Sequence, residues 1–129
     1  EIARHPRFPQ ETLQAANPMA LRVGGSIAIP DALYGVDFGG KFRFFAVEAD
    51  RRTEPIRGRG RVASHLLGKI QSYISVVSTE AYRNIWGVPV LTIRFVTDRP
   101  VRAENIRTEI ASLVPLKFRS NFVVECASS

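Results

Sequence analysis

Cysteine is almost absent from this sequence of 129 residues, since Cys126 is the single one. One cysteine cannot form an internal disulfide, which excludes a disulfide-stapled scaffold. Histidine is also scarce, and neither His5 nor His65 has a second histidine or a cysteine at ligand spacing, which argues against a zinc site. The fold must therefore be stabilised by a hydrophobic core.

Long apolar runs and a signal-peptide pattern are also missing, so the sequence has no transmembrane or secretory signature. We expect a cytoplasmic, bacterial protein with no membrane partner. Residues 1–18 contain three prolines, which predicts an irregular lead-in. Because the chain opens on Glu1 rather than methionine, we expect a piece of a longer protein from which a partner domain is missing.

Acidic residues are fewer than basic ones in this chain. The chain has 12 acidic against 18 basic residues, a formal charge of +6, and nearly all of the bases are arginine, which binds phosphate in planar bidentate contacts. The densest block is interleaved with glycine and comprises Arg51, Arg52, Arg57, Arg59 and Arg61. This block is a candidate DNA-binding loop, and a merely solubilising loop is the alternative.

The hydrophobic pattern predicts one α/β domain over residues 19–129. With 45% hydrophobic and 23% charged residues, this length can bury a real core. Apolar residues recur at helical spacing over residues 61–77 and 98–113. Strands are expected at 19–23, 26–29, 43–50, 88–96 and 121–124. The predicted order is βββαβαβ, with a mixed central sheet flanked by helices.

Three carboxylates accompany the early strands. Residues two apart in a strand share a face, so Glu48 and Asp50 are expected on one side of the sheet. A hairpin turn at residues 37–40, where Gly39 and Gly40 suit a tight turn, would bring Asp31 towards them. Hard oxygen ligands of this kind suit Mg²⁺, so Asp31, Glu48 and Asp50 are candidate metal ligands.

Two patterns in this region resemble known families. Pro30-Asp31, a gap of sixteen residues and then Glu48-Ala49-Asp50 resembles the PD-(D/E)xK restriction-endonuclease-like core. The run Phe44 to Pro55, with Lys69 and Tyr73 as a K-x-x-x-Y pattern downstream, is similar to the replication-relaxation proteins of bacteria and their plasmids. The resemblance covers roughly residues 26–97.

This resemblance implies a DNA-binding, nuclease-like domain that acts in plasmid replication or mobilisation, with a DNA-binding winged-helix domain upstream of it in the full-length protein. It implies Mg²⁺-dependent nicking, with Asp31, Glu48, Asp50 and Lys69 as catalytic residues. Asp50 stands where the nuclease pattern has lysine, so Lys69 of the following helix is the candidate replacement. Tyr73 is expected in the core, although its hydroxyl could also reach a phosphate or act as a nucleophile.

Two other functions stay open at this point. Because Asp50 replaces the expected lysine, the domain could be a catalytically inactive DNA-binding or assembly module of the same fold. A protein-interaction domain without nucleic acid is the third reading, and it predicts that the arginine block tolerates neutralisation.

Overall fold

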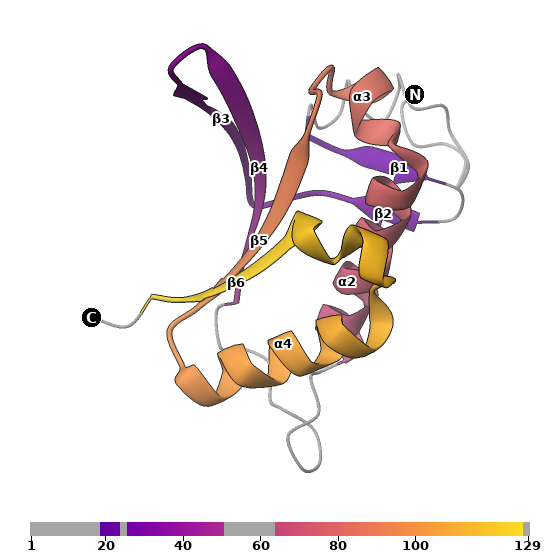
Figure 1. The fold of residues 1–129 in the computed structure, drawn as a ribbon. Helices are drawn as coiled ribbons and strands as arrows, with labels where there is room; N and C mark the ends of the chain where they lie inside the picture. The colour runs from indigo at the N-terminus through magenta and orange to yellow at the C-terminus, as the bar shows by residue number, and fades with distance from the viewer. Residues whose placement is uncertain (1–18, 24–25, 51–63, 128–129) are drawn as a thin grey trace.

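The computed structural model describes residues 19–23, 26–50 and 64–127, and the statements below concern these residues. Figure 1 shows the arrangement. The strands are β1 (Leu21–Val23), β2 (Ser26–Ala28), β3 (Ala32–Phe38), β4 (Lys41–Ala49), β5 (Leu91–Thr97) and β6 (Phe122–Cys126). The helices are α2 (Ser64–Thr79), α3 (Ala81–Ile85), α4 (Pro100–Leu113) and the 3-10 helix η1 (Leu116–Asn121). None of these helices has the length and apolar character needed to cross a bilayer.

The centre of the domain is a mixed sheet of four strands in the order β3-β4-β5-β6. The pair β3 and β4 is antiparallel, whereas β4 with β5 and β5 with β6 are parallel. The prediction of an α/β domain with a mixed central sheet flanked by helices is confirmed. The strands β1 and β2 pair with each other in a separate two-stranded sheet.

The hairpin β3–β4 differs in part from the prediction. Its turn lies where the glycines indicated: Gly39 and Gly40 both have positive φ, and the amide of Gly40 donates to Asp37 Oδ1 at 2.9 Å. However, the partner of β4 is β3, an additional strand that the hydrophobic pattern did not predict. The glycine in this strand, Gly35, leaves room for the ring of Phe44, which a Cβ would approach to 2.7 Å.

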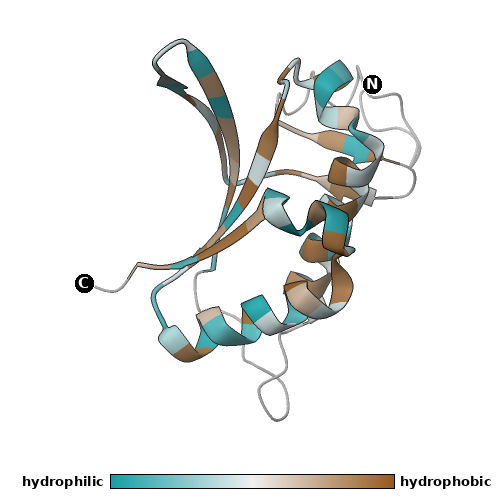
Figure 2. Ribbon diagram, in the orientation of Figure 1, coloured by the Kyte–Doolittle hydropathy of each residue, from teal (hydrophilic) through white to brown (hydrophobic). Residues whose placement is uncertain are grey.

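Both long helices lie on the same side of the four-stranded sheet (Figure 1). Alternate residues of β5 are buried, which is the pattern of a sheet covered on one face only. The predicted stripe of α2 is confirmed where the structure describes it, because Leu66, Ile70, Tyr73 and Val77 are all buried. In Figure 2 hydrophobic colour runs along much of β5 and β6, and hydrophilic and hydrophobic colours alternate along α4. The core therefore lies between the sheet and the helices.

Candidate functional site

Glu48 is the central residue of the candidate site. It lies near the carboxyl end of β4, on the side that faces the helices, and only 3% of it is exposed. Its Oε1 accepts a hydrogen bond from Lys69 Nζ at 2.9 Å, and its Oε2 accepts one from Tyr73 Oη at 2.6 Å. Lys69 and Tyr73 are four residues apart on α2, so both reach the same strand. The K-x-x-x-Y spacing thus provides one partner for each oxygen of a buried carboxylate.

Tyr73 occupies the buried end of this cluster. It is 1% exposed and packs edge to face against Phe95, with 6.3 Å between the ring centroids. Burial raises the pKa of its hydroxyl far above the ordinary range, and the negative charge of Glu48, its hydrogen bond and the charge of Asp31 raise it further. The hydroxyl therefore keeps its proton and donates to Glu48. This arrangement suits a positioning residue and disfavours a tyrosinate nucleophile.

Asp31 is held beside the carboxyl end of β4. Its amide donates to the carbonyl of Val47 at 2.9 Å, and its Oδ2 accepts from the amide of Ala49 at 2.8 Å. These bonds extend the hairpin by one residue on each strand and bring a second carboxylate next to Glu48 in the sheet. The contribution of Asp31 to the raised pKa of Tyr73 places it in the same electrostatic environment.

Asp50 meets a different helix. It follows β4 directly, and its amide donates to the carbonyl of Val96 at 2.7 Å. Its Oδ2 accepts from Arg102 Nε at 2.6 Å and its Oδ1 from Arg102 Nη2 at 3.1 Å. The side chains of Asp50 and Arg102 are only 7% and 2% exposed. Asp50 therefore belongs to a buried ion pair with α4.

The predicted set of site residues is brought together in part. Asp31, Glu48, Lys69 and Tyr73 come together at the junction of β4 and α2, while Asp50 is bound by Arg102. Among the residues that the structure describes, no three carboxylate, histidine or cysteine side chains are grouped to hold one metal ion. The predicted DNA-binding arginines, Arg51, Arg52, Arg57, Arg59 and Arg61, lie outside the described residues.

Arg102 is a site residue that the sequence patterns did not predict. It occupies the first turn of α4 and continues the apolar stripe formed by Ile106, Ile110 and Leu113, at spacings of four, four and three. A charged residue in an apolar stripe is the signal that could have found it, because buried charges are paired.

Of the three predicted metal ligands, only Asp31 and Glu48 fit a hard cation, because Asp50 is paired with Arg102. Asp31 and Glu48 provide carboxylate oxygens, the ligands that Mg²⁺ prefers, and Lys69 adds a cation beside them. The side chain of Lys69 is 37% exposed, so solvent reaches this side of the pair. Comparison of the chain with protein-family models, curated proteins and solved structures finds no match.

Proposed function

We propose that this chain is a DNA-binding domain of PD-(D/E)xK nuclease-like fold, of the replication-relaxation type, and that it nicks DNA with Mg²⁺ during plasmid replication or mobilisation. The observation that carries the proposal is the contact between Lys69 and Glu48 next to Asp31. A nuclease of this class needs acidic ligands and a lysine at one place. Here a helix residue supplies the lysine that the strand lacks, since Asp50 occupies its usual position.

Asp31 and Glu48 would hold the metal, and Tyr73 would orient Glu48 through its hydrogen bond. Bound Mg²⁺ supplies a Lewis acid that polarises a phosphoryl oxygen and lowers the pKa of a bound water. Lys69, whose side chain is partly exposed, would stabilise negative charge on the phosphoryl group. The formal charge of +6 and the arginine block at residues 51–61 favour contact with the phosphate backbone.

A second candidate function is a non-catalytic DNA-binding or assembly module of the same fold. It is favoured because the carboxylates already have partners within the domain. Lys69 and Tyr73 donate to the two oxygens of Glu48, and Arg102 donates to both oxygens of Asp50. In this alternative the polar groups stabilise the domain, and the arginine block alone provides the function.

A plasmid-nicking assay distinguishes the two candidates. Supercoiled plasmid is incubated with the protein and Mg²⁺ or Mn²⁺, and relaxed circles are measured against time. We expect the Asp31→Ala/Glu48→Ala double variant to fall to the rate without protein, because it removes both metal ligands. The control variant Glu80→Ala/Glu104→Ala also removes two exposed acids, one from the turn before α3 and one from α4, and is expected to retain nicking.

Circular dichroism must show that both variants are folded. Nicking that persists in the Asp31→Ala/Glu48→Ala variant would place the reaction elsewhere. If neither the wild type nor the variants nick but all bind plasmid, the non-catalytic module is the correct function.

A further inference from the structure

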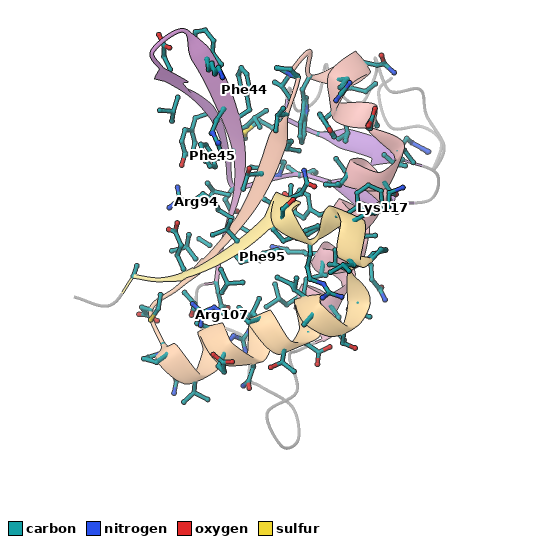
Figure 3. All side chains as sticks on the ribbon, viewed as in Figure 1. Phe44, Phe45, Arg94, Phe95, Arg107 and Lys117 are labelled. Atoms are coloured by element: carbon teal, nitrogen blue, oxygen red, sulfur yellow. The ribbon has the colours of Figure 1, made fainter. Side chains whose placement is uncertain are left out.

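The face of the sheet opposite the helices carries a second cluster of side chains. Tyr34 on β3 is the direct neighbour of Phe45 on β4, so the two share this face. Arg94 alternates with the buried Phe95 along β5, and Figure 3 places these two side chains on opposite sides of the strand. No helix in the described part of the chain covers this face (Figure 1). We refer to it as the open face.

Two aromatic rings lie side by side on the open face. Tyr34 and Phe45 are stacked, with 5.3 Å between centroids and 25° between ring planes. The guanidinium of Arg94 lies 5.7 Å from the centroid of Phe45 and donates a hydrogen bond to the hydroxyl of Tyr34. Glu125 of β6 accepts a second hydrogen bond from Arg94. The rings are therefore held in place, and 36% of Tyr34 remains exposed.

Cations dominate the charge around these rings. Lys41 and Arg43 precede Phe45 by four and two residues on β4, so they lie on the same face, and both are exposed. The acid Glu125 is paired with Arg94. Glu48, in contrast, lies on the other side of the sheet, towards the helices. The open face thus combines aromatic rings with positive charge.

We infer that the open face binds single-stranded DNA, with a base stacked on the Tyr34–Phe45 pair and the backbone phosphates near Lys41 and Arg43. Rings on a sheet surface can stack only on unpaired bases, which favours a single strand over a duplex, and neighbouring cations neutralise the backbone. This inference rests on the proposed DNA-binding function and adds a surface separate from the Glu48 site. A domain that nicks DNA would use it to hold the strand that opens beside the nick.

The test measures, by fluorescence anisotropy, the binding of a labelled oligo-dT of about 12 nucleotides, a length within the range that one such surface covers. Tyr34→Leu is expected to weaken binding by about tenfold or more, because it removes a stacking ring. Tyr34→Phe keeps the ring and loses only the hydroxyl, so its affinity should stay within about twofold of the wild type. Arg43→Ala should lower the slope of log affinity against log salt by about 1. Arg83→Ala removes the same charge from α3 and should leave the affinity unchanged.

Equal affinity of the Tyr34→Leu and Tyr34→Phe variants would overturn the inference, as would equal losses in Arg43→Ala and Arg83→Ala. A duplex of the same length and the plasmid assay are run in parallel. If the wild type binds duplex and Tyr34→Leu binds oligo-dT as well as the wild type does, only the open-face inference is refuted. If the wild type binds neither oligo-dT nor duplex nor plasmid, the proposed function is refuted too. A Tyr34-dependent dimer that binds no oligo-dT would assign the face to protein contact and also overturn the inference.

Discussion

Glu48 and Asp50 are two residues apart and face the same side of the sheet, yet their surroundings differ. Glu48 shares its oxygens between two residues of α2, one of which, Lys69, is 37% exposed. Asp50 gives both oxygens to a single residue of α4, Arg102, which is 2% exposed. The first carboxylate has a partner that solvent can reach. The second is sealed in a bidentate pair.

This difference separates two roles for acids in one short stretch. A buried bidentate pair is geometrically specific, so the Asp50–Arg102 pair fixes α4 against the end of β4. The Glu48 cluster contains a cationic side chain, that of Lys69, which is 37% exposed. Solvent therefore reaches the partner of Glu48, whereas the pair of Asp50 and Arg102 is almost fully buried.

The largest effect on stability is expected for Arg102→Ala. The substitution leaves the carboxylate of Asp50 buried without its partner, and breaking a buried pair in this way costs about 3–5 kcal/mol. Urea unfolding followed by circular dichroism measures the loss. Arg107→Ala, which removes an exposed arginine from the same helix, is the control and should cost no more than about 1 kcal/mol. Similar losses in the two variants would show that the Asp50 pair is not sealed.

An intermediate effect is expected for Tyr73→Phe. The variant leaves Glu48 Oε2 without its donor, which costs about 1–3 kcal/mol for a buried acceptor. The cost should depend on pH. Above the ordinary tyrosine pKa of about 10, unfolded Tyr73 loses its proton while the folded residue, with its raised pKa, keeps it, so wild-type stability falls as pH rises.

The contribution of Tyr73 is thus fully present below pH 10 and declines above it, by at most about 1.4 kcal/mol per pH unit. Because Tyr73→Phe has no such proton, the difference in unfolding free energy between the two proteins should narrow between pH 10 and 11. Urea titrations at pH 8, 10 and 11 measure it. A difference that stays constant would mean that Tyr73 is not held protonated by its surroundings.

Much of the fold could be predicted from local patterns. The stripe of α2 and the glycine turn of the hairpin depend on residues close in sequence, and both are present as expected. Strand β3 was missed because Gly35 and Asp37 interrupt its apolar character, and it is the pairing with β4 that makes it a strand. The burial of only one face of the four-stranded sheet likewise depends on where the helices pack.

The site could be predicted only as a set of residue types. The shared side of Glu48 and Asp50 follows from strand geometry, and Lys69 was identified as a neighbour through the resemblance. Which acid meets which cation depends on the placement of α2 and α4 over the strand ends, and this is a tertiary property. Arg102 is 52 positions from Asp50, and no pattern in the neighbouring sequence indicates that the two residues pair.

The smallest effect on stability, with a large effect on function, is expected for Lys69→Met. Methionine keeps the apolar contact of the lysine stem, and because the lysine side chain is 37% exposed, water can replace the ammonium at Glu48 Oε1, so the unfolding free energy should fall less than in Tyr73→Phe. Plasmid nicking should nevertheless fall to background, because the cation that faces the phosphoryl group is gone. Urea unfolding and the nicking assay on the same preparation measure both quantities. A stability loss as large as that of Arg102→Ala would make the Glu48–Lys69 pair a structural clamp like that of Asp50, and the distinction between the two carboxylates would then be lost.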